Sequence, residues 1–230
     1  GVSNLFRPQN QTVSVTLALG FGAFVIGTVV EVEGNIRKDL TLSFGEGQPN
    51  LLFFDVQTDQ IEGVLDLLPE PVRSNAEVAP LVPSKIVAIN GRTPEELRAD
   101  TVRERRPDAW ALRREYRNSY RARLGRAETL VHGRWWDGTP GEEDGQEVDA
   151  GGLTRLSLEL EVARSLKVSL GDTITWDISG FRVPSVLTNL RRVDWNRMEP
   201  NFYAILEPGG LEDGPQTVMI VARLEDSGAR

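Results

Sequence analysis

Charge is distributed very unevenly along this 230-residue sequence. Arg7 is the only charged side chain among residues 1–30, which leaves this part at +1 and residues 31–230 at −9. Residues 13–30 read VSVTLALGFGAFVIGTVV, and fifteen of these eighteen residues are apolar or glycine. An α-helix of that length spans roughly 27 Å, which is close to the hydrocarbon thickness of a bilayer. The run therefore predicts a transmembrane helix.

Two other interpretations of the apolar run stay open, a cleaved signal peptide and a buried helix or strand of a soluble protein. A signal peptide would use Arg7 as its positive region, but the run is long and ends in EVEG without a clear cleavage site. A globular core helix normally has a polar face, which this run lacks. The pairs Ala18/Gly22 and Ala23/Gly27 have the small-xxx-small spacing of membrane helices that pack on other helices.

The helix is expected to continue past the membrane as a stalk. Val32, Ile36 and Leu40 follow the run at spacings of four, with charged residues between them. One arginine before the run against Arg37 and Lys38 after it does not fix the orientation by the positive-inside rule. The strongly acidic remainder is better suited to the outside of the membrane.

Composition excludes many kinds of functional site. The chain has no cysteine, one histidine and a formal charge of −8. Thiolate metal centres, cysteine nucleophiles and disulfides are therefore excluded, and most histidine-based zinc sites need more than one imidazole. The net charge gives no general reason to expect nucleic-acid binding. No phosphate-binding glycine loop, nucleophile elbow or H-x-x-x-H motif is present. We expect no enzyme, and assign no catalytic, cofactor-binding or metal-binding residue; the ligand-binding residues stay unknown.

The remainder of the chain reads as an α+β domain rich in β-structure. A loop over 44–50 is followed by a buried strand, a short helix and a broken extended segment, which together predict a β-α-β unit. Later patterns predict four further strands, a helix and a hairpin. The ranges are 50–56, 57–68 and 77–90 for the β-α-β unit, 115–123, 128–136, 198–206 and 217–224 for the strands, 158–168 for the helix, and 173–178 with 181–193 for the hairpin.

The segment from Gly91 to Arg126 is rich in arginine. Ten arginines lie between Arg98 and Arg126, against four acidic residues. Nucleic-acid binding is one interpretation of such a segment, helped by Tyr116 and Tyr120. Residues 115–123 alternate as a strand with one charged face does, which favours salt bridges with a partner or contact with anionic lipid.

Two further features invite a functional interpretation. His132 with the pair Trp135/Trp136 could form an aromatic ligand site, although a place in the core or at a strand edge is favoured. The acidic loop 137–152 contains Glu142 and Glu143, which in principle could act as a hydrolytic carboxylate pair. This loop lacks the D-x-D-x-D-G order of a calcium loop, so a solvated turn is favoured.

Several segments together resemble the FtsX/MacB-like ABC transporter permeases, and within that family the YbbP-like branch. The resemblance covers nearly the whole chain and rests on NLFRPQNQTVSVTLALGFG, NLLFFDVQTDQ, PSKIVAINGR, GRWW, LELEVARSLKVSLGDTITWDISG and LRRVDWNRMEPNFYAIL. Its most specific elements are L-G-D-T-I-T at residues 170–175 and R-x-V-D-W-x-x-x-x-P-N-F at residues 191–202.

The resemblance implies a fold and a division into domains. Residues 1–45 would form the transmembrane helix and stalk, and the rest a MacB-like periplasmic domain. In that domain, residues 46–90 would be the first part of a ferredoxin-like subdomain, 91–207 an inserted β-rich subdomain, and 208–230 the return strand. A second apolar span and the second α-β segment of the ferredoxin-like half do not occur in the sequence. We therefore expect this chain to be part of a longer permease.

The resemblance also implies a function without a chemical site. Such a permease transmits the motion of a cytoplasmic ABC ATPase to its outer domain, and so moves lipid, lipoprotein or other hydrophobic cargo. The implied partners are that ATPase, the lipid bilayer and a hydrophobic substrate or periplasmic protein, with no nucleic acid. The implied location is the inner membrane, with the main domain outside the cytoplasm. A membrane-tethered binding module is the alternative, and an extracytoplasmic hydrolase a weaker one.

Overall fold

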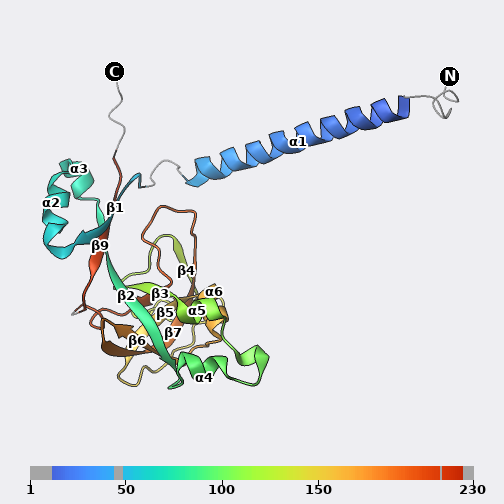
Figure 1. The fold of residues 1–230 in the computed structure, drawn as a ribbon. Helices are drawn as coiled ribbons and strands as arrows, with labels where there is room; N and C mark the ends of the chain where they lie inside the picture. The colour runs from blue at the N-terminus through green and yellow to red at the C-terminus, as the bar shows by residue number, and fades with distance from the viewer. Residues whose placement is uncertain (1–11, 44–48, 213, 225–230) are drawn as a thin grey trace. The chain divides into compact units, whose positions relative to one another are not determined.

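The computed structural model describes residues 12–43, 49–212 and 214–224. The chain divides into two units, residues 1–46 and residues 47–230. The first unit contains one long helix, and the second contains every described strand (Figure 1). The predicted α+β layout, with an apolar helix ahead of a β-rich domain, is confirmed. The loop predicted over 44–50 lies mostly outside the described residues.

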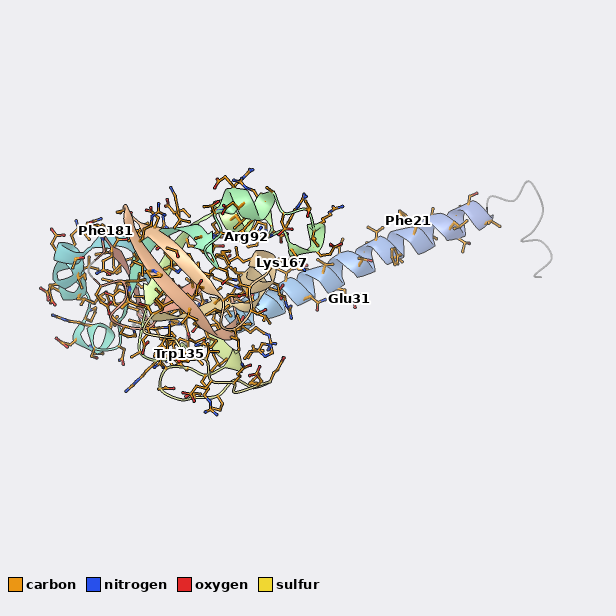
Figure 2. All side chains as sticks on the ribbon, turned by 90° about the horizontal axis from the view of Figure 1, so that it is seen from below. Phe21, Glu31, Arg92, Trp135, Lys167 and Phe181 are labelled. Atoms are coloured by element: carbon orange, nitrogen blue, oxygen red, sulfur yellow. The ribbon has the colours of Figure 1, made fainter. Side chains whose placement is uncertain are left out.

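The first unit is the helix α1, Thr12–Ser43, which runs without interruption through the apolar run and the polar segment after it. The hydroxyl of Thr28 donates to the carbonyl of Phe24 at 2.8 Å, so this polar group is satisfied within the helix. Figure 2 shows Phe21 in the apolar part and Glu31 at the start of the polar part. The predicted helix and its continuation past residue 30 are confirmed.

The second unit begins with a three-stranded sheet built from distant parts of the sequence. β1, Leu51–Gln57, and the first part of β2, Glu77–Ile89, both pair antiparallel with β9, Thr217–Ala222. β1 and β2 are therefore parallel to each other, with β9 between them. The helical connection consists of η2 (Thr58–Gln60), α2 (Ile61–Asp66) and α3 (Glu70–Arg73). The predicted β-α-β unit is confirmed, with the predicted helix over 57–68 divided and a second short helix after it.

The helices α2 and α3 cover one face of this sheet. Val56, Val218 and Ile220 are buried there against Ile61 and Val64. The prediction of a buried strand over 50–56 is wrong, because β1 lies at the sheet edge with no partner among the described strands on its other side. On the opposite face its side chains Leu52 and Phe54 are 47% and 51% exposed.

β2 is one strand that passes from this sheet into a second one. Its residues 77–81 pair with β9, whereas residues 82–85 pair with β3 on the other side. The extended segment predicted over 77–90 was expected to be broken, and this prediction is wrong, because β2 runs without interruption through Pro80 and Pro83. Each proline lies where β2 is paired on one side only, so the missing N–H group is tolerated on the open side.

The second sheet closes on itself. Each strand pairs with the next in the order β2, β3 (Glu115–Tyr120), β8 (Ala204–Leu206), β5 (Thr154–Glu159), β7 (Phe181–Val193) and β6 (Thr173–Ile178). The last of these, β6, pairs with β2 and so closes the sheet. β4, Glu128–Gly133, adds to the far end of β7. The interior contains the largest core cluster, including Trp176, Tyr116, Leu156, Leu187 and Leu206. The predicted hairpin of β6 and β7 is confirmed with both ranges.

Several local predictions need correction. The segment predicted as a helix over 158–168 begins as β5, and α6 covers only Leu160–Leu166. The strand predicted over 198–206 is confined to β8. The arginine-rich segment contains one strand, β3, but also three short helical turns that the sequence analysis missed: α4 (Pro94–Arg98), η3 (Arg103–Arg105) and α5 (Ala109–Arg113). Each of these turns contains at least one arginine.

Candidate functional site

The acidic loop lies directly along β4. The backbone N–H groups of Gly141, Glu142 and Glu143 donate to the carbonyls of Gly133, Leu130 and Val131 at 2.8–2.9 Å. Within residues 137–152 the structure assigns no helix or longer strand, so the predicted loop is confirmed. The carboxylates of this segment are thereby placed beside the side chain of β4 that faces them.

That side chain is His132. Its Nδ1 lies 3.0 Å from Oδ2 of Asp144, and its Nε2 lies 3.4 Å from Oε2 of Glu143. The pKa of Asp144 is lowered chiefly by the backbone N–H of Gln146 and also by the hydrogen bond with His132. Both ring nitrogens therefore face loop carboxylates, and the imidazole fastens the loop to the sheet.

Gly133 is required where β4 meets β7. Its φ is +79°, and a Cβ there would lie 2.2 Å from the carbonyl oxygen of Thr188. We expect Gly133→Ala to lower the free energy of unfolding by about 2–4 kcal/mol, since strain in the left-handed region adds to a backbone clash. Thermal denaturation of the whole chain in detergent, followed by circular dichroism, measures this loss.

The matched control is Gly151→Ala, because Gly151 also has a positive φ, +58°, but has no neighbouring atom within 4 Å of a Cβ. This variant is expected to lose about 1 kcal/mol from backbone strain alone. Equal losses in the two variants would contradict the predicted clash.

The tryptophan pair is part of the core. The rings of Trp135 and Trp136 lie 3.7 Å apart between centroids, and Trp135 is 1% exposed. Their indole N–H groups donate to the carbonyls of Ala122 and Arg121, both at 2.9 Å. Since both donors are used within the fold, the pair fastens the turn after β3 and packs with a cluster comprising Ala79, Leu81, Leu130, Phe202, Ile205, Met219 and Val221. The favoured interpretation as core is the one the structure supports.

The most unusual polar group is a buried ion pair that the sequence analysis missed. Arg191 on β7 is fully buried, and its guanidinium donates to Glu128 on β4 at 2.7 Å, to Ser157 Oγ at 3.1 Å and to the carbonyl of Phe202 at 2.7 Å. Glu128 also accepts from Arg121. Burial lowers the pKa of Arg191 to about 10, while Glu128 acts in the opposite direction. This network joins β4, β5 and β7.

Several arginines of the segment from Gly91 to Arg126 have partners within the second unit. Arg98 pairs with Glu95, and Arg121 pairs with Glu128. The guanidinium groups of Arg114 and Arg117 lie over the rings of Tyr203 and Phe54, at 4.2 Å and 4.7 Å from the centroids. A continuous strip of basic side chains, as a nucleic-acid surface needs, does not form over β3.

The carboxylates weighed as a hydrolytic pair are engaged or exposed. Glu143 faces His132 and lies 3.9 Å from Arg192, while Glu142 points to solvent. Among the described residues, no group of three or more His, Asp or Glu side chains is arranged to hold a metal ion. The geometry therefore gives the acidic loop a structural role and points to no catalytic centre there.

Comparison with known proteins supplies what the geometry does not. No family model matches the chain, and no solved structure matches it. The curated protein YbbP of Escherichia coli strain K12, described as an uncharacterized ABC transporter permease, is 27% identical to it over 227 residues. The match covers 98% of this chain and 25% of YbbP. This chain is a relative of an ABC transporter permease. It spans about a quarter of the length of that relative.

The length and apolar surface of α1 are those of a membrane-spanning helix, as expected in a relative of a permease. Within the described ranges, the segment Val13–Ile36 is the one helical stretch long and apolar enough to cross a bilayer, and none of its apolar window is buried against the rest of the chain. Large side chains such as Leu17, Phe21, Phe24 and Ile26 are more than 60% exposed. Such a surface is stable in lipid and costly in water.

Proposed function

We propose that this chain is part of a permease that transmits the ATP-driven motion of a separate ABC ATPase to an extracytoplasmic domain, and so moves lipid, lipoprotein or other hydrophobic cargo. The observation that carries the proposal is the similarity to an ABC transporter permease along 98% of the chain. The chain itself is not an enzyme in this proposal, and ATP is hydrolysed by the partner subunit.

The length of α1 supports a mechanical role. Its 32 residues span roughly 48 Å as an α-helix, of which about 30 Å would lie in the hydrocarbon of the bilayer. The remaining part would project from the membrane as a rigid continuation of the same helix. A continuous helix can pass a displacement from the membrane to the domain that follows it.

We propose the inner membrane as the location, with residues 47–230 outside the cytoplasm. The acidic composition of that part supports this orientation. We further propose that residues 46–90 and 208–230 form a ferredoxin-like subdomain of a MacB-like periplasmic domain and that residues 91–207 form its β-rich insert. The order β1-β9-β2, with helices on one face, is compatible with such a subdomain.

Breaking α1 between the bilayer and the domain tests the mechanical role. Gly34 lies in the polar part of α1 with no neighbouring atom within 4 Å of a Cβ. Gly34→Pro removes a helix hydrogen bond and kinks the helix. In the complete permease reconstituted with its ATPase, we expect ATP-dependent release of bilayer lipid to fall about ten-fold, with the ATPase still co-purifying.

Gly34→Ala is the matched control, because it keeps the helix and adds one methyl group. It is expected to release lipid at the parent rate. Failure of any ABC ATPase to co-purify with the parent permease would overturn the proposed function. Equal release by the proline and alanine variants would overturn the role of α1 as a mechanical link.

A further inference from the structure

A cleft in the second unit combines positive charge with an apolar floor. It has a volume of about 680 Å³ and lies between the second part of β2, α4, the end of α5 and the hairpin of β6 and β7. In Figure 1 the end of β2 lies beside α4, with α5 nearby. A volume of this size falls in the range of roughly 300–1,000 Å³ that is typical of small-molecule sites.

The rim of the cleft is cationic in a chain whose net charge is −8. The charged residues that line it are Lys85, Arg98, Arg113, Arg114, Arg182 and one carboxylate, Glu95. Three of these cations form ion pairs at 2.9–3.4 Å: Lys85 with Glu115, Arg98 with Glu95, and Arg182 with Asp177. This leaves a positive excess from Arg113, the last residue of α5, and Arg114, which follows it.

Those two arginines, Arg113 and Arg114, keep their donors available. Arg114 stacks over Tyr203, a contact that uses the face of the guanidinium and leaves its in-plane N–H groups free to donate. Arg113 is exposed, and within the described part of the chain it has no ion pair or hydrogen bond to its side chain. Arginine side chains in this state suit a phosphate or carboxylate, which they bind by paired N–H groups.

The floor of the cleft is apolar. Ile86 and Leu112 are buried beneath it, and Val87 and Ala88 are partly exposed along β2. An anionic group held at the rim would therefore lie next to a surface that favours hydrocarbon. A ligand with both parts, an anionic head and an apolar chain, gains from both surfaces, whereas a simple anion gains only from the rim.

We propose that this cleft binds an amphiphile whose phosphate ester head group carries a net negative charge, with Arg113 and Arg114 holding the phosphate and the floor contacting the first part of the hydrocarbon. The inference goes beyond the transport role, because it assigns a binding site that needs neither nucleotide nor ATPase. A negative result would remove the site and leave the permease role intact.

The test uses the 230-residue chain in a non-ionic detergent and isothermal titration calorimetry. The probes are dihexanoyl phosphatidylglycerol, dihexanoyl phosphatidylcholine and inorganic phosphate, each below its micellar concentration where one applies. We expect the anionic lipid to bind about ten-fold or more tightly than either other probe. Arg113→Glu is expected to weaken it at least about ten-fold, whereas Arg113→Lys stays within about three-fold.

Arg123→Glu is the matched control, because Arg123 is exposed and does not line the cleft. It is expected to leave the affinity unchanged within about two-fold, since it changes net charge alone. Equal binding of the two lipids, or equal weakening by both charge reversals, would overturn the site. Binding of inorganic phosphate as tightly as the anionic lipid would overturn the amphiphile and identify a simple anion.

Discussion

Arg191→Met is expected to lower the free energy of unfolding by about 3–5 kcal/mol, because it leaves a buried carboxylate with one of its two cations removed. Glu128 is 1% exposed at its side chain and would retain only Arg121 as an ionic partner. The buried Ser157 hydroxyl and the Phe202 carbonyl would also lose a donor. Thermal unfolding of the whole chain in detergent should show a midpoint lower by roughly 10 °C.

Arg164→Met is the matched control for this network. Arg164 pairs with Glu161 at 2.6 Å, but their side chains are 65% and 69% exposed. An exposed pair contributes at most about 0.5–1 kcal/mol, so this variant should unfold close to the parent midpoint. A loss below about 1 kcal/mol for Arg191→Met would contradict the assigned role of the buried pair.

A double variant separates the attraction between Arg191 and Glu128 from the cost of leaving one of the two charges buried alone. In Arg191→Met with Glu128→Leu, both charges of the fully buried pair are removed, and Arg121, whose side chain is 18% exposed, loses its carboxylate partner. We expect the combined loss to be smaller than the sum of the two single losses by about 1–3 kcal/mol, since contacting residues are not additive. Additive losses would indicate that Arg191 stabilises the fold through Ser157 and Phe202 alone.

The sequence predicted correctly those elements whose structure depends on residues close together in the chain, namely α1 and the hairpin of β6 and β7. The uncharged run from Val13 to Val30 predicts the apolar part of α1, because a run of this length without a polar face is typical of a helix that crosses a bilayer. The hairpin of β6 and β7 follows from Ser179-Gly180 between two runs of alternating and β-branched residues, and both central residues adopt positive φ. These elements need no knowledge of distant parts of the chain.

Long-range pairing produced the errors. Pro80 and Pro83 suggested a strand break, but β2 changes its pairing partner between them, from β9 to β3. The residues near the two prolines do not indicate which distant strands pair there. β1 was predicted to be buried from its apolar composition, although burial depends on whether another strand covers its edge. Residues 158 and 159 resemble the start of a helix in the sequence, but both pair with β7, and residue 158 also pairs with β8 on the other side.

The candidate site followed the same division. The Trp135/Trp136 pair and the acidic loop were visible in the sequence, and their structural interpretation was the favoured one. The buried Arg191 was missed, yet a signal existed. Arg191 and Arg192 are adjacent in a strand, so they must face opposite sides of the sheet, and one of them must face the interior. Their side chains are 0% and 56% exposed.

Placing two lysines in the middle of α1, by Leu19→Lys with Ile26→Lys, is expected to abolish membrane insertion of the 230-residue chain. Both positions lie within roughly 7 Å of the centre of the apolar run along the helix axis. Each charge there costs about 2.5–3.5 kcal/mol of insertion free energy, so the pair costs about 5–7 kcal/mol. That cost lowers the equilibrium ratio of inserted to non-inserted chain by more than a thousand-fold.

Membrane fractionation with alkaline carbonate extraction measures the outcome. Leu19→Ala with Ile26→Ala is the matched control, because it shortens the same two side chains without adding charge. The parent and the alanine variant should stay in the carbonate-resistant membrane pellet, and the lysine variant should leave it. If the lysine variant remains in the pellet like the parent, α1 is not the segment that holds this chain in the bilayer, and the mechanical link proposed for it has no basis.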